Sequence, residues 1–229
     1  MGKRRVFFSE LAYAVGMITL AIGTAFMEKA DFGISMVVAP AYLIHLRVSE
    51  ILPFYTFGMS EYIFQAFLLI LLSVVMRKFK KSYLFSFVTA VLYGFTLDAA
   101  ISVVACLPFS GICARAVYYV LGMVLCSVGV AFFFKTYISP EAYELFVGDV
   151  SRKFQLSITR VKTVYDVVSC LIGVIMSFVF FGFGVFEGVK LGTIFCALIN
   201  GFMIGKISAY LDKAFDFRDA LGLRHIFDK

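Results

Sequence analysis

Six apolar stretches of the sequence are each about 20 residues long, the length that an α-helix needs to cross a bilayer. They cover approximately residues 6–27, 55–76, 84–106, 115–135, 160–182 and 188–209. Hydrophobic residues make up 62% of the chain, more than a soluble domain of 229 residues could bury. Backbone groups in lipid must be hydrogen-bonded within the structure, and the apolar runs are continuous rather than alternating, so we expect helices and not a β-barrel. The sequence therefore predicts an all-α membrane protein with six transmembrane helices.

Two shorter segments, about residues 34–48 and 139–154, follow the first and fourth spans. Ser139 is a good N-cap for the second short segment, and Ser35 is the matching candidate in the first. If these segments re-enter the membrane, their N-terminal N–H groups face a cavity and favour anions or carboxylates. The alternative is that they lie flat at the interface as amphipathic helices. The acidic residues of the second segment count against re-entry, whereas the first segment carries no charge over residues 32–44.

Basic residues are distributed unequally between the two sides of the predicted bundle. With six spans, 17 of the 21 Lys and Arg residues lie on the side that holds both termini. The other side holds only Lys29, Arg47, Arg115 and Lys190. Because cytoplasmic loops carry an excess of Lys and Arg, this bias predicts that both termini are cytoplasmic. It also explains the net charge of +6 without a nucleic-acid partner.

The two halves of the sequence resemble each other. Residues 13–29 (YAVGMITLAIGTAFMEK) and 119–135 (YVLGMVLCSVGVAFFFK) are identical at seven of 17 positions, and the order of span, short segment, span and span also repeats. Each half has three spans, so the second half must insert upside down relative to the first. We therefore predict a 3+3 inverted-topology repeat, an architecture in which transporters bind ligands near the midplane. The first repeat covers residues 1–110, the second covers 111–210, and a short amphipathic helix on the cytoplasmic side is expected over 211–229.

Several short motifs are similar to those of the YitT/YczE group of bacterial integral membrane proteins. They are KADFGIS after the first span, LYGFTLD in the third, and TRVKTVYD and GVKLGTIFCALINGFMIG in the last two. Lys29, Asp31 and Ser35 fit the first motif, and Arg160 and Asp166 fit an Arg…Asp/Glu pair. The chain departs from the family pattern at one position of the first motif and one of the last, which is typical of a divergent member. The resemblance implies a bacterial cytoplasmic membrane protein of a largely uncharacterised family, and it implies no activity.

Ionisable side chains within the predicted spans are costly, so they usually face a cavity or a partner. Glu61, Asp98 and Asp166 lie within spans, and Asn200 lies at a depth comparable to that of Asp98. One interpretation is a polar cavity that accepts a cationic substrate or relays protons. The other is structural: Arg160 forms an ion pair with Asp166, and Asp98 holds a neighbouring helix end. The candidate substrate-binding residues are Asp31, Ser35, Glu61, Asp98, Ser139, Asp166 and Asn200.

We expect a multi-pass protein of the bacterial inner membrane that acts as a secondary transporter or channel for a small solute bound between the two halves. The alternative is a non-transporting membrane partner that holds or regulates another protein. The sequence contains no phosphate loop, zinc-ligand spacing or nucleophile elbow, so we expect no enzyme activity, no cofactor and no metal. Acidic cavity residues favour a cation and helix N-termini favour an anion, so a zwitterion would satisfy both. The expected partners are the lipid bilayer and the solute or ion, and a homodimer stays open as an alternative.

Overall fold

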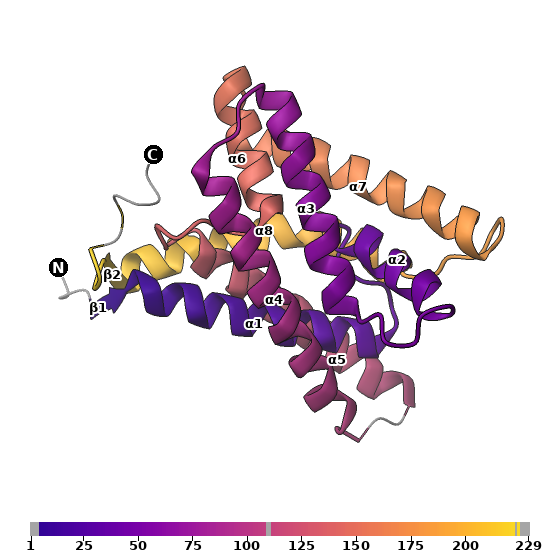
Figure 1. Ribbon diagram of the computed structural model, residues 1–229. Helices are drawn as coiled ribbons and strands as arrows, with labels where there is room; N and C mark the ends of the chain where they lie inside the picture. Colours follow the sequence, from indigo (N-terminus) through magenta and orange to yellow (C-terminus); the bar gives the residue numbers. More distant parts are fainter. Residues whose placement is uncertain (1–4, 109–110, 223, 225–229) are drawn as a thin grey trace.

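The computed structural model describes residues 5–108, 111–222 and 224, and these residues form eight α-helices and two short strands (Figure 1). The helices are α1 (Ser9–Ala30), α2 (Ala39–Ser49), α3 (Phe57–Met76), α4 (Lys81–Ala105), α5 (Gly111–Phe133), α6 (Ala142–Phe154), α7 (Ile158–Phe181) and α8 (Leu191–Ala214). All except α2 and α6 are long and apolar enough to cross a membrane. The six predicted spans are therefore confirmed.

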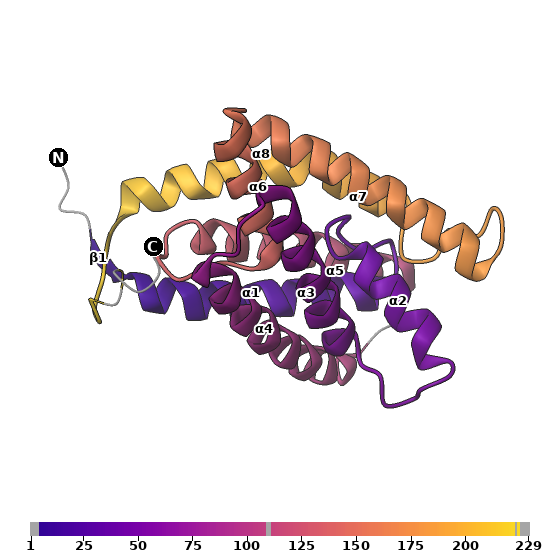
Figure 2. The same cartoon turned by 45° about the horizontal axis from the view of Figure 1, so that its top comes forward.

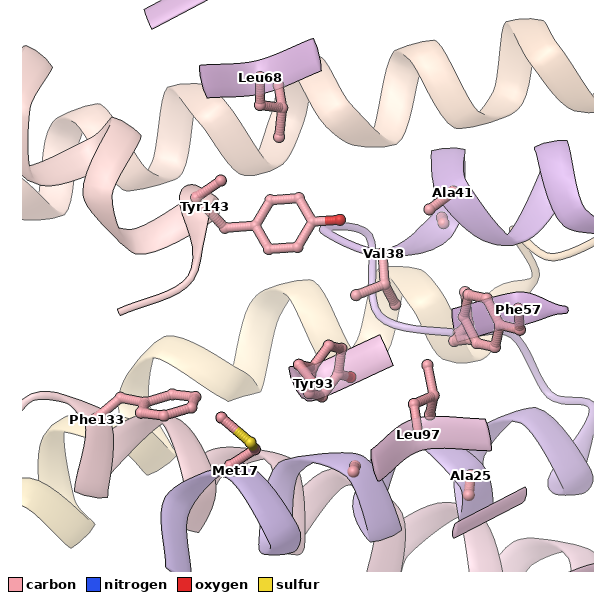
Figure 3. Packing of buried hydrophobic residues seen from close by; sticks show 14 of the residues in the cluster. Met17, Ala25, Val38, Ala41, Phe57, Leu68, Tyr93, Leu97, Phe133 and Tyr143 are labelled. Carbon is pink, nitrogen blue, oxygen red and sulfur yellow. The ribbon is translucent and has the colours of Figure 1, made fainter. Parts of the chain in front are cut away.

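The long helix α1 packs against α4 and, most extensively, against α5. Glycines allow the closest approach between α1 and α5, because a side chain there would meet the partner's backbone. A Cβ atom on Gly23 would lie 2.8 Å from the Gly122 carbonyl oxygen, and one on Gly122 would lie 2.7 Å from that of Gly23. Gly16 and Gly129 approach each other in the same way. Apolar side chains from most of the helices fill the space around this crossing (Figure 3).

The short helices α2 and α6 run from the interior of the protein to its surface. Ala39 and Ala142, the first residues of the two helices, are fully buried. The residues that follow their last turns, Glu50 and Gln155, are exposed. Each short helix packs against both α3 and α7, and Figure 2 shows α7 at the edge of the bundle. The N-terminal ends of both short helices therefore lie inside the protein.

The two ends of the described chain lie together. Strands β1 (Arg5–Phe8) and β2 (Phe215–Arg218) pair in parallel, with Phe7 opposite Phe217. This arrangement corrects the expected amphipathic helix over residues 211–229, because α8 continues to Ala214 and a strand follows it. Phenylalanine alternates with polar residues in β2, and this period of two suits a strand. Residues 223 and 225–229 of the predicted tail lie outside the described residues.

Candidate functional site

A cavity of about 40 Å³, lined by both apolar and polar side chains, lies where the chain breaks before α2 and α6. One water molecule needs roughly 10–15 Å³ of such space, so the cavity has room for about three waters or a group of similar size. Its polar lining comes from both the first half of the chain (residues 5–108) and the second half (residues 111–222). The first half contributes Thr24, Ser35 and Tyr93, and the second contributes Glu141, Tyr143, Glu144, Lys162 and Asn200. Figure 3 shows Tyr143 reaching from the start of α6 towards the break before α2.

Two buried side-chain hydrogen bonds fix the long helices on either side of this cavity. In the first half, the hydroxyl oxygens of Thr24 on α1 and Tyr93 on α4 lie 3.0 Å apart. In the second half, the hydroxyl of Ser127 on α5 donates to the side-chain oxygen of Asn200 on α8, at 2.7 Å. These four side chains are thus hydrogen-bonded to each other in pairs, which removes most of the cost of burying them.

A buried carboxyl pair adjoins the cavity. Glu61 on α3 is fully buried and Glu141, just before α6, is 2% exposed. The amide nitrogen of Gln65 donates to one oxygen of each carboxyl group, at 3.3 Å to Glu61 and 3.0 Å to Glu141. The Tyr143 hydroxyl also donates to Glu61, at 2.9 Å. The remaining oxygens of both carboxyl groups, and one oxygen of Glu144, are buried without a partner.

The electrostatic setting of Glu141 and Glu144 disfavours their ionised forms. Burial, followed by the charges of Glu144 and Glu61, raises the pKa of Glu141 well above its usual range. Burial also raises the pKa of Glu144, against the opposing effect of the Lys162 ammonium group. These two carboxyl groups therefore hold protons more tightly than exposed carboxyl groups do.

A second cavity of about 70 Å³ adjoins the first and shares Tyr143, Glu144 and Lys162 with it. Its lining also includes Phe134, which follows the last turn of α5, and Gly148 in the middle of α6. The second cavity therefore lies along the first half of α6. Glu144 belongs to the wall of both cavities.

Polar contacts between the two halves close the far side of the cavity, away from the strands. Asp31, which follows α1, forms ion pairs with Lys190 and with Arg115, the latter at 3.0 Å. The Thr193 hydroxyl donates to the Ile34 carbonyl at 2.7 Å. These contacts join the break before α2 to α5 and to the start of α8.

A corresponding set of contacts closes the side near the strands. Asp149 on α6 is 1% exposed and forms ion pairs with Lys80 and Arg152, both at 2.7 Å. The Tyr83 hydroxyl donates to the same carboxylate at 2.9 Å. The Thr89 hydroxyl on α4 donates to the Ser139 carbonyl at 2.9 Å. The cavity is thus bounded at both ends by polar contacts that cross from one half of the chain to the other.

Three of the predicted site residues lie at or beside the cavity. Ser35 and Asn200 line it, and Glu61 contacts it through Tyr143, which is part of its wall. Ser139 is buried in the break before α6, but that helix begins at Ala142, three residues beyond the expected N-cap. The N-cap position belongs instead to Glu141.

The other predicted residues have different surroundings. Asp31 is half exposed and belongs to the far-side ion pairs. Asp98 accepts from the Gly58 N–H at 2.8 Å and the Thr56 hydroxyl at 2.7 Å, so it caps the start of α3. This is the structural role considered for Asp98 from the sequence.

The ion pair expected between Arg160 and Asp166 requires a correction. Asp166 pairs with Lys162 at 3.3 Å, and among the described residues no ion pair joins it to Arg160. Side chains four residues apart share one face of a helix, whereas those six apart point to different faces.

Sequence reasoning missed Gln65, Glu141, Tyr143, Glu144 and Lys162 as site residues. The available signal is the unusual number of charges in the second short segment. From the sequence alone, these charges count against re-entry of that segment. Glu141 and Glu144 instead lie at the buried start of α6. Gln65 of α3 donates to Glu141, and Lys162 of α7 lines the same cavity as Glu144.

The fold and the apolar surface of its six long helices define a multi-pass membrane protein. Residues 7–209 match the model of DUF6198, a family of unknown function, so the chain belongs to that family. This agrees with the expectation of an uncharacterised family, and the match itself does not give the YitT/YczE name that the short motifs suggest. Neither the curated proteins nor the solved structures gave a match to the chain.

Proposed function

We propose that this protein is a secondary transporter or channel for a small polar solute that binds in the central cavity between two inverted halves. The observation that carries the proposal is the cavity itself, whose polar wall combines both chain breaks with the middle of the long helices. Interrupted helices that meet at a polar site near the midplane are typical of transporters built from inverted repeats.

The contacts between α1 and α5 support an inverted repeat. In the sequence alignment of the halves, Gly16 corresponds to Gly122, and Gly23 corresponds to Gly129. Gly16 contacts Gly129, whereas Gly23 contacts Gly122. Such an exchange of equivalent positions is what a two-fold axis between two similar units produces.

Two equivalent lysines support the same symmetry. Lys29, at the end of α1, donates to three carbonyl groups at the end of α4, at 2.7 to 3.0 Å. Lys135, which corresponds to Lys29 and follows α5, pairs with Asp212 near the end of α8 at 2.7 Å. Each lysine therefore ties the first long helix of its half to the third.

Helix packing follows the repeat in part. Helix α2 packs against α7 as α6 packs against α3, and α1 packs against α4 as α5 packs against α8. However, α3 packs closely against α4, and the described residues of α7 and α8 make no comparable contact. The two halves thus adopt different arrangements, as expected for a transporter that is closed differently on its two sides.

We further propose that the protein lies in the bacterial cytoplasmic membrane with both termini in the cytoplasm. The distribution of 17 of 21 basic residues on the side of the termini supports this orientation. The Asp149 ion pairs then close the cytoplasmic side, and the Asp31 ion pairs close the opposite side.

A thermal-shift screen of small solutes on the purified protein tests the proposal. The screen should include amines, amino acids, small carboxylates and inorganic ions, because the cavity of about 40 Å³ carries both acidic groups and a lysine. A solute at a hundredfold excess over its Kd stabilises the native state by about 2.7 kcal/mol. For a chain of this length, that corresponds to a rise in melting temperature of about 5–10 °C.

A cavity variant shows whether a stabilising solute binds at the proposed site. Asn200→Leu replaces a polar cavity wall with an apolar one of similar size and should abolish the solute-induced shift. Ser102→Ala, on the exposed surface of α4, is the matched control and should keep it. A screen in which no solute stabilises the protein would favour the non-transporting membrane partner. A shift that persists in Asn200→Leu would move the binding site elsewhere.

A further inference from the structure

We propose that Glu61 and Glu141 together form a proton-binding site, and that the proton is exchanged for the positively charged group of a solute that enters the cavity. The proton site follows from the geometry of the two carboxyl groups. The exchange step rests on the proposed transport function.

The geometry of Gln65 holds the two carboxyl groups together. Its side-chain oxygen accepts the backbone N–H of Ala142 at 3.1 Å, which fixes the orientation of the amide. Its nitrogen is thereby directed at both Glu61 and Glu141, at 3.3 and 3.0 Å. The two acids come from different halves of the chain, and a single amide serves both.

The unpaired oxygens of this carboxyl pair favour a bound proton. Oε1 of Glu61 and Oε1 of Glu141 are both buried without a hydrogen-bond partner. Two ionised carboxylates that share one amide donor, with the Tyr143 hydroxyl as the further donor to Glu61, would be strongly disfavoured away from water. A proton on one of the free oxygens neutralises one charge and converts an unsatisfied acceptor into a donor. The pair is therefore expected to hold one proton at neutral pH.

The charges around the pair do not compensate a second negative charge. The titratable groups near the pair come from several helices. They are Tyr143 and Glu144 of α6, Tyr93 of α4, Tyr13 of α1, and Lys162, Tyr165 and Asp166 of α7. Lys162 is the one basic group in this set, and it already pairs with Asp166. The tyrosines are neutral, and Glu144 adds to the acidic charge. The raised pKa of Glu141 is consistent with this balance.

The cavity gives the proton an exchange partner and a route. Glu141 lines the central cavity, and Glu144 lines both this cavity and the second one along α6. When an ammonium group of a solute reaches Glu141, it neutralises the carboxylate in place of the proton. The O–H bond of the protonated carboxyl group breaks, the electron pair stays on the carboxylate oxygen, and the proton leaves past Glu144. One positive charge enters the site for each one that leaves.

Infrared spectroscopy of the full-length purified protein without any solute tests the proton site. The wild type should retain a protonated-carboxyl stretching band at about pH 7, where exposed carboxyl groups are ionised. Both Glu61→Gln and Glu141→Gln should remove this band or shift its titration midpoint by about one pH unit or more. The matched control, Glu50→Gln, removes an exposed carboxyl group that pairs with Arg47 and should leave the band unchanged.

The titration of the wild type and a third variant keep the test decisive if one glutamine variant does not fold. Gln65→Leu removes the shared donor, so it should weaken the ionised form and raise the midpoint of the band. The absence of the band at about pH 7 in the wild type would overturn the proton site. A band that is unchanged in every folded variant of the pair would overturn it as well.

Proton release on binding tests the exchange step with methylammonium, a probe small enough for the cavity. In weakly buffered solution, methylammonium should release about one proton per protein from the wild type and none from Glu141→Gln. A persistent infrared band without proton release would overturn the exchange and leave the proton site intact. A solute screen in which nothing binds, with the infrared band present, would contradict the transport function but not the proton site.

Discussion

Replacing Gly23 by alanine should destabilise the protein by about 2 kcal/mol. The added Cβ atom would lie 2.7 Å from the Cys126 backbone nitrogen and 2.8 Å from the Gly122 carbonyl oxygen. These are backbone atoms, so the clash can be relieved only by moving α5 away from α1. Overpacking of this kind costs about 3 kcal/mol at the upper end of its usual range. Alanine recovers about 1 kcal/mol because it favours a helix more than glycine does.

Gly201→Ala on α8 is the matched control for this substitution. Its added Cβ atom would have no heavy atom within 4 Å, so only the gain in helix propensity remains. In thermal unfolding of the purified proteins, Gly23→Ala should melt about 4–8 °C below the wild type. Gly201→Ala should melt at or above the wild-type temperature. Equal melting temperatures for the two variants would refute the close crossing of α1 and α5.

Three further predictions concern Lys29, Asp98 and Glu141. Lys29→Met removes the donor to three carbonyl groups at the end of α4 and should lower stability by about 1–3 kcal/mol in chemical unfolding, whereas an unchanged midpoint would contradict the contact. Asp98→Ala removes the cap of α3 and should cost about 1–2 kcal/mol while leaving solute affinity unaltered; a loss of affinity in a folded variant would return Asp98 to the binding site. The pKa of Glu141 is higher in the native state than its usual value of 4.5. The stabilisation that its proton gives the native state is therefore complete below pH 4.5 and is lost as the pH rises through the native pKa. Melting temperatures should therefore fall with rising pH in the wild type and fall less in Glu141→Gln; parallel curves would contradict the raised pKa.

The membrane-spanning helices could be predicted from the sequence because hydropathy is a local property. Each predicted span overlaps one long helix, and the ends differ by a few residues. The last span was expected to end at residue 209, but α8 continues to Ala214. The extension contains Asp212 and Lys213, and the Asp212 carboxylate pairs there with Lys135 at 2.7 Å. Hydropathy does not detect such a continuation, because the partner of Asp212 is distant in the sequence.

The composition of the site could be predicted only in part, because it depends on contacts between distant segments. Asp98 and Glu61 both lie within apolar spans, and hydropathy does not distinguish them. The structure separates them, since Asp98 caps α3 whereas Glu61 joins Gln65 and Tyr143. Glu141 is the reverse case, because the charge of its side chain predicts exposure whereas the structure buries it. Its hydrogen-bond donor, Gln65, lies 76 residues away in the sequence.

The most direct test of the central claim is uptake of a solute by liposomes that contain the purified protein. The solute is one that stabilises the protein in the thermal-shift screen. We predict protein-dependent uptake in the wild type and in Ser102→Ala, and its loss in Asn200→Leu, whose altered side chain faces the cavity. Uptake no faster than in protein-free liposomes, or uptake that Asn200→Leu leaves unchanged, would contradict a transport site between the two halves.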